Sequence, residues 1–173
     1  MRPAHPVPGG GRLLLDVQQV IPLPEASELA IELRRKATQE RAVRGTDGRD
    51  WTQYVITGPS GESEPLRKRQ AVLTMVTTLR AAGVSAREIA RAIPNSRFLS
   101  VDGTTTGAEL REAFALAYPK FDPGRWFVDS PVHDEGRTWI VTKMWGRTTE
   151  PVLERHTKLA PRHSGIGYEA VSL

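Results

Sequence analysis

The chain has 173 residues, of which 39% are hydrophobic and 25% are charged, and it contains no cysteine. This length and composition predict one soluble globular domain, and the absence of thiols excludes disulfides, thiolate metal ligands and a cysteine nucleophile. No apolar run approaches the ~18 residues that a membrane-spanning helix needs. Residues 1–11 lack the apolar segment of a secretory signal, so we expect a cytoplasmic protein.

The net charge of +4 is unevenly distributed. Residues 67–97 contain seven Lys or Arg and a single acid, Glu88, whereas residues 98–136 contain three basic and seven acidic side chains. A basic segment of this density favours an anionic partner, because each phosphate that it neutralises releases counterions. The alternative is a solvent-exposed helix face whose acidic partners lie in residues 98–136.

The first third predicts a leader, a strand and a helix. Residues 1–11 are rich in Pro and Gly and predict a flexible leader, and residues 12–23 are apolar enough for a strand. A helix is expected over about 25–42, with one buried stripe at helical spacing: Ala26, Leu29, Ala30 and Leu33.

The middle of the chain predicts a hairpin and two helices. Trp51 to Thr57 is typical of a strand, and the following GPSG predicts a tight turn into a short return strand. A helix is expected over 66–82, and it carries an apolar stripe of Val72, Met75, Val76 and Leu79. Gly83 suits the position after its end, and Ser85 with Glu88 predicts a capping box that opens a second helix.

Beyond Pro94 the pattern alternates between strands and helices. Residues 97–101 predict a strand, and Thr106 with Glu109 predicts a second capping box, opening a helix that ends at Pro119. Two aromatic segments, RWFV at 125–128 and TWIVT at 138–142, predict two strands around an Asp134–Gly136 turn. A last helix is expected from Thr148 or Thr149 to Pro161, and residues 163–173 are expected to form a partly ordered tail.

Residues 79–93 resemble the turn and second helix of helix-turn-helix DNA-binding proteins. The resemblance lies in AGVSAREIARAI, where glycine permits a sharp turn, serine caps the second helix and Ile89 faces the first. It implies that the second helix enters a major groove, with Arg87 and Arg91 on one exposed face. A structural helix hairpin with no ligand remains the alternative.

The basic side chains near these helices and near the tryptophans are the candidate nucleic-acid contacts: Arg67, Lys68, Arg69, Arg87, Arg91, Arg97, Lys143 and Arg147. The cluster Arg67–Arg69 should touch phosphates, whereas Arg87 should approach base edges.

Three of the four tryptophans, Trp126, Trp139 and Trp145, lie within 20 residues of each other. We interpret them as core residues, since large aromatic side chains dominate core packing. A platform for an unpaired base, flanked by arginines and lysines, is the alternative. In a winged-helix fold the same hairpin would be the wing.

Residues 66–168 also resemble an uncharacterised C-terminal module of bacterial nuclease and restriction-like proteins. The resemblance lies in RWFVDSP, GRTWIV and WGRTTEPVLE. It implies a restriction-associated, nucleic-acid context and carries no catalytic residues over to this chain.

No catalytic, metal or cofactor motif is recognised. The adjacent His133, Asp134 and Glu135 diverge too much to chelate one ion and suggest a polar turn. The nearest approach to a two-metal nuclease motif has Arg34 in place of the lysine, and arginine gives up no proton near neutral pH. We therefore expect no enzyme, no cofactor and no metal.

The sequence as a whole predicts a single α+β domain over 12–162, with helix-turn-helix or winged-helix-like helices packed on small antiparallel strand pairs. The predicted core is Leu29, Leu33, Val55, Val72, Met75, Val76, Leu79, Ile89, Leu110, Phe114, Trp126, Trp139, Ile140 and Leu153. The expected function is a non-enzymatic DNA-binding accessory or regulatory module. A protein-interaction module, acting as an adaptor or a dimerising subunit, is the alternative.

Overall fold

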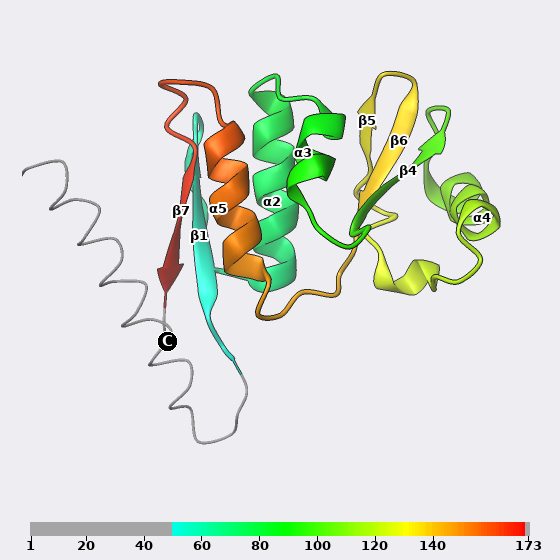
Figure 1. The fold of residues 1–173 in the computed structure, drawn as a ribbon, viewed down its shortest axis with the longest axis horizontal. Coiled ribbons are helices and arrows are strands. Elements are labelled where there is room, and N and C mark those ends of the chain that lie inside the picture. Colours follow the sequence, from blue (N-terminus) through cyan, green and yellow to red (C-terminus); the bar gives the residue numbers. More distant parts are fainter. Residues whose placement is uncertain (1–49, 172–173) are drawn as a thin grey trace, which may run out of the picture. The chain divides into compact units, whose positions relative to one another are not determined.

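The computed structural model describes residues 50–171, which form an α+β fold with four helices and two small antiparallel sheets (Figure 1). In chain order the elements are β1 (Gln53–Gly58), β2 (Gly61–Glu62), β3 (Leu66–Arg67), α2 (Lys68–Ala81), α3 (Ala86–Ala92), β4 (Phe98–Asp102), α4 (Gly107–Ala117), the 3-10 helix η1 (Pro123–Arg125), β5 (Val132–Asp134), β6 (Arg137–Val141), α5 (Thr149–Leu159) and β7 (Gly167–Val171). The predicted leader, the strand over 12–23 and the helix over 25–42, with Leu29 and Leu33, lie outside the described residues.

The first sheet is built around β1, which pairs with β7 along one side and with β2 and β3 along the other. The predicted hairpin at GPSG is confirmed, and the stretch expected as a tail contains β7. Successive side chains of a strand point to opposite faces. Tyr54 and Ile56 face the core, so the prediction of Val55 as a core residue is wrong by one position.

The second sheet has the order β4-β6-β5, and both faces of β6 are covered. Val141 and the half-buried Trp139 contact one apolar cluster, whereas Ile140 belongs to another, so the predicted alternation along β6 is confirmed. The prediction of a strand over 125–128 is wrong. Arg125 ends η1, and Trp126 makes only a single bridge to Thr142.

The partner strand of β6 is β5, and the connection is the two-residue turn Glu135-Gly136. Both turn residues have positive φ, 49° and 70°, as a tight hairpin turn requires. The predicted position of the turn is confirmed, but the predicted partner of β6, the aromatic segment 125–128, is wrong.

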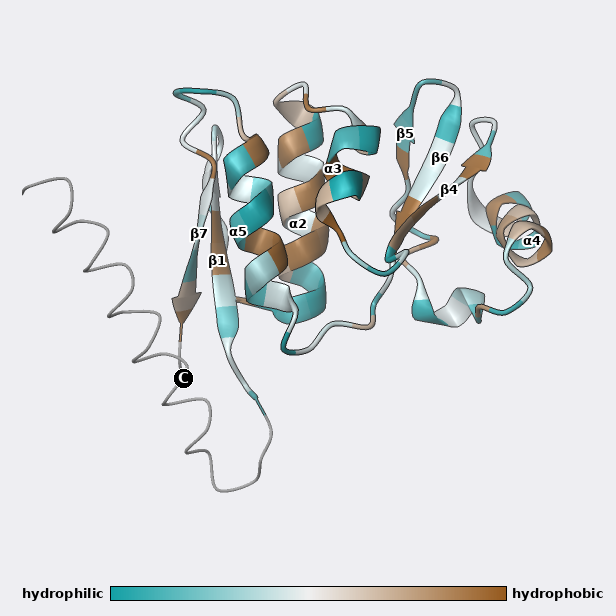
Figure 2. Cartoon of the chain, viewed as in Figure 1, coloured by the Kyte–Doolittle hydropathy of each residue, from teal (hydrophilic) through white to brown (hydrophobic). Residues whose placement is uncertain are grey.

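Three helices, α2, α3 and α5, pack together with the first sheet around the larger apolar cluster. The four predicted stripe residues of α2 are all fully buried, and α3 buries Ile89. Figure 2 shows hydrophobic residues along β1 and α2, whereas the visible side of α3 is hydrophilic.

Helix α4 covers the second sheet, where Leu110 and Phe114 are fully buried. Thr106 is the N-cap residue of α4, as predicted, but its side chain makes no capping hydrogen bond. Within residues 50–171, none of the helices is both long and apolar enough to cross a membrane.

Candidate nucleic-acid interface

Helix α2 ends in a turn that directs the chain sharply into α3. The amide of Val84 donates to the carbonyl of Leu79 at 3.0 Å, and the amide of Gly83 donates to that of Arg80 at 3.0 Å. This is the Schellman pattern, which needs a left-handed residue after the helix. Gly83 supplies it with φ of 89°. The local geometry expected from the sequence is therefore present.

Helix α3 begins with the predicted capping box. The Glu88 amide donates to the Ser85 hydroxyl at 3.2 Å, and the Ser85 amide donates to the Glu88 carboxylate at 3.1 Å. The hydrogen bond from the Ser85 side chain, followed by that from its backbone, lowers the pKa of Glu88. The exposed carboxylate is thus held charged at the start of α3.

The β5–β6 hairpin contacts the same turn. Asp134 accepts from the Ala86 amide at 2.7 Å and forms an ion pair with Arg80 at 2.8 Å. Arg80 in turn donates to the Val84 carbonyl at 2.7 Å. The carboxylate therefore connects the hairpin to the end of α2 and the start of α3.

Asp134→Ala should lower the free energy of unfolding by about 1–3 kcal/mol, because it leaves the half-buried guanidinium of Arg80 and the Ala86 amide without their acceptor. The measurement is urea denaturation. Asp129→Ala is the matched control. It breaks the exposed ion pair with Arg111, so it should change stability by only ~0–1 kcal/mol. Equal effects of the two substitutions would show that the hairpin contact is not stabilising.

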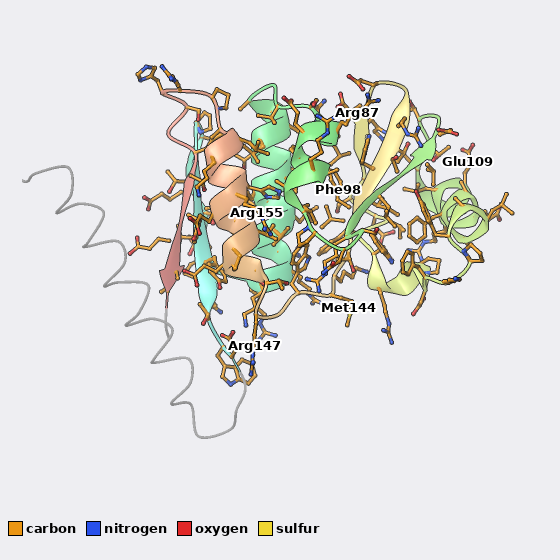
Figure 3. The ribbon with its side chains drawn as sticks, in the orientation of Figure 1. Arg87, Phe98, Glu109, Met144, Arg147 and Arg155 are labelled. Carbon is orange, nitrogen blue, oxygen red and sulfur yellow. The ribbon has the colours of Figure 1, made fainter. Side chains whose placement is uncertain are left out.

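Arg87 and Arg91 both lie exposed on α3, but their surroundings differ (Figure 3 labels Arg87). Arg87 forms an ion pair at 3.3 Å with Glu135 of the hairpin turn. Arg91 forms no ion pair with a described residue, but its charge helps to lower the pKa of Glu88, which lies one turn earlier on α3. Arg80 and Arg87 thus take acidic partners from residues 98–136, as the alternative interpretation of the charge pattern expected.

The predicted phosphate cluster lies at the other end of α2. Arg67 and Arg69 are exposed and have no ion pair within the described chain, whereas Lys68 is paired with Asp50. Helix α2 has 14 residues, so its two ends are roughly 20 Å apart. That distance corresponds to about six base pairs of a duplex.

Two of the remaining candidates are engaged in internal contacts. The Arg97 guanidinium donates to the Thr148 hydroxyl and lies 5.2 Å from the centre of the Trp145 ring. Lys143 donates to the Gly124 carbonyl at 3.1 Å and lies 5.6 Å from the Phe127 ring. Arg147, in contrast, is exposed and carries no ion pair with a described residue.

The clustered tryptophans are packing residues. Trp126 is buried against Phe114, with ring centres 5.0 Å apart, and Trp139 packs on Phe98 at 5.3 Å. Trp145 is half-buried, and its indole N–H donates to the Thr142 carbonyl at 2.7 Å. Of the two interpretations of this segment, the structure favours the core.

The prediction of a polar turn over residues 133–135 is confirmed only for Glu135, because His133 and Asp134 belong to β5. The His133 ring contacts the Thr138 hydroxyl of the paired strand at 3.2 Å. Among the described residues, no three His, Asp or Glu side chains are grouped as a metal site would need. Sequence reasoning missed the role of Asp134 and Glu135 at the α2–α3 turn. Their acidity was visible, but the pairing depends on how the hairpin packs.

The arrangement offers exposed guanidinium groups at both ends of α2, and such groups can donate to phosphate oxygens in pairs. No protein-family model matches this chain, and neither a curated protein nor a solved structure matches it.

Proposed function

We propose that this chain is a non-enzymatic DNA-binding accessory or regulatory module, which contacts DNA through the helix-turn-helix-like pair α2 and α3. The observation that supports the proposal best is a set of exposed arginines, on or next to this pair, that form no ion pair with a described residue: Arg67, Arg69 and Arg91. Guanidinium groups left free in this way are available for phosphate contacts, which supply most of the affinity for nucleic acid.

The pairing of Arg87 with Glu135 is compatible with this function. Both side chains are more than half exposed, and an exposed ion pair contributes only ~0–1 kcal/mol. Arg87 can therefore exchange the carboxylate for a base edge or a phosphate at small cost. Glu135→Gln should strengthen binding at low salt, since it removes a negative charge beside the contact.

Substitutions at Arg87 and at Arg67 should affect DNA binding in different ways. Arg87→Ala should flatten the preference among duplex sequences, because a bidentate arginine–guanine pair contributes ~1–3 kcal/mol of discrimination. Arg67→Ala should weaken all sequences alike and reduce the salt slope by ~1. The measurement is fluorescence anisotropy on a panel of labelled duplexes.

Arg111→Ala is the matched control, because Arg111 is also an exposed, ion-paired arginine but lies on α4 beside Asp129. It should leave DNA binding unchanged. Identical, uniform losses from Arg87→Ala and Arg67→Ala would remove the base-reading role and leave a nonspecific basic surface.

A protein-interaction module is the second candidate, and it is favoured by exposed apolar side chains. Leu116 is 87% exposed, Met144 53% and Phe121 41%. Light scattering after size-exclusion chromatography measures the molar mass in solution and so shows whether the chain self-associates. A dimer that Leu116→Glu dissociates would favour this candidate over DNA binding.

A further inference from the structure

One tryptophan differs from the other three in its surroundings. Trp51, just before β1, is 61% exposed, whereas Trp126, Trp139 and Trp145 are buried or half-buried. An exposed indole offers a flat apolar face that can stack on a planar ligand. Trp51 takes no part in either apolar cluster of the described chain.

The backbone around Trp51 is fixed from both sides. The Asp50 carboxylate accepts from the Thr52 amide at 3.1 Å and from its hydroxyl at 2.6 Å. Lys68, the first residue of α2, forms an ion pair with the same carboxylate and donates to the Asp50 carbonyl at 3.2 Å. Burial by itself raises the pKa of Asp50, but the hydrogen bonds from Lys68 and Thr52 together outweigh it. The pKa of Asp50 is therefore below its ordinary value, and the anchoring carboxylate stays charged.

Three exposed arginines come from segments that meet at the end of the fold where β1 begins. Gln53 follows Trp51 by two residues, and Arg67 lies opposite Gln53 in the β1–β3 pairing. Arg69 follows in the first turn of α2. The first turn of α5 also lies at this end, beside the start of α2 (Figure 1). Figure 3 places Arg147, just before α5, at the same end of the described chain.

We propose that the Trp51 patch, formed by Trp51, Arg67, Arg69 and Arg147, binds single-stranded DNA, with one base stacked on the indole and the flanking phosphates held by the arginines. The inference rests on the proposed function and names the form of nucleic acid that this end of the molecule takes. A duplex base has both faces stacked on its neighbours, so a free indole face selects an unpaired base. Stacking needs no base-specific hydrogen bonds, so binding tolerates different sequences.

Charge and shape both favour single-stranded DNA as the ligand of the Trp51 patch. Three guanidinium groups without acidic partners in the described chain suit a polyanion, and a single exposed aromatic face suits one planar base. The anchoring of residues 50 and 52 means that little ordering of the backbone that carries the ring is needed on binding.

The test uses the full chain and a labelled oligothymidylate of about 15 nucleotides. Trp51→Leu should weaken binding about 5- to 100-fold, whereas Trp51→Phe, which keeps an aromatic face, should stay within about threefold of the natural chain. Binding to a duplex of the same length should change less than twofold in both variants. Leu116→Ala, at an exposed apolar position on α4, is the control and should change neither.

Tryptophan fluorescence supplies a second readout. Oligothymidylate should quench the natural chain, and the quenching should disappear in Trp51→Phe although binding persists. Equal affinity of Trp51→Leu and the natural chain for the single strand would overturn the patch but leave the proposed function standing. Binding to neither single strand nor duplex at low salt would overturn the proposed function itself. Oligouridylate bound more than about tenfold tighter than oligothymidylate would overturn DNA as the ligand.

Discussion

Leu110→Ala is expected to lower the free energy of unfolding by about 2–5 kcal/mol. Leu110 is fully buried in the cluster between α4 and β6, where it lies with Phe114, Trp126 and Ile140. Removing its terminal carbons costs the transfer energy of the apolar surface and leaves a cavity, because the surrounding rings cannot collapse fully. Urea denaturation followed by circular dichroism measures the change.

Leu116→Ala is the matched control for this prediction. It is the same chemical change on the same helix, but the Leu116 side chain is 87% exposed. The expected change is within about 0.5 kcal/mol. A loss of comparable size from both substitutions would mean that α4 packs on the sheet through a different face.

Acid should destabilise the fold through His156. This residue of α5 is fully buried, and neither ring nitrogen has a hydrogen-bond partner within the described chain. Desolvation is the main cause that lowers the pKa of His156 to about 4; the nearby backbone of Ile89 partly opposes it, and the charge of Arg155 adds a smaller lowering effect. The folded state therefore tolerates the buried imidazole while it is neutral and is destabilised when the ring takes up a proton.

The direction of the pH effect follows from the two pKa values. The unfolded chain takes up the proton near pH 6.5, whereas the folded chain does so near pH 4. Between these values the unfolded state binds more protons, so the free energy of unfolding should fall as pH drops from about 6.5 to about 4. The full loss is on the order of 3 kcal/mol.

His156→Leu should remove this part of the acid dependence and raise stability most at the acid end, since it replaces an unsatisfied polar ring with an apolar side chain. His163→Leu, at an exposed position, should leave the acid dependence in place. Denaturation midpoints measured at several pH values compare the three chains. Parallel acid losses in the natural chain and His156→Leu would assign the effect to carboxylates instead.

Local signals predicted the α2–α3 region correctly. The stripe of α2, the glycine after its end and the Ser85–Glu88 capping box act over a few residues, so the sequence contains all of their partners. The candidate site was only partly predictable. Exposure of Arg67, Arg69 and Arg91 agrees with their charge, but the ion pair of Arg87 with Glu135 joins residues far apart in the chain.

The errors arose where tertiary packing chooses between similar segments. Val55 and Ile56 are equally suited to a core, and only the docking of α2 decides that Ile56 faces inward. The segment RWFV has high strand propensity, yet β6 pairs with the less aromatic β5, because the Glu135-Gly136 turn sets the register. The sequence predicts Trp51 as a strand residue, but β1 begins only at Gln53, and Trp51 is left exposed before it.

The most direct test of DNA binding is the salt dependence of the affinity of the full chain for duplex and single-stranded DNA between about 50 and 200 mM salt. Arg67, Arg69 and Arg91 are exposed and form no ion pair with a described residue. They predict that log K falls linearly with log salt, with a slope of about −2 to −4. A slope in this range whose magnitude is smaller by ~1 in Arg67→Ala would support DNA binding through these arginines. An affinity that does not change with salt, or the absence of binding at about 50 mM salt, would contradict it.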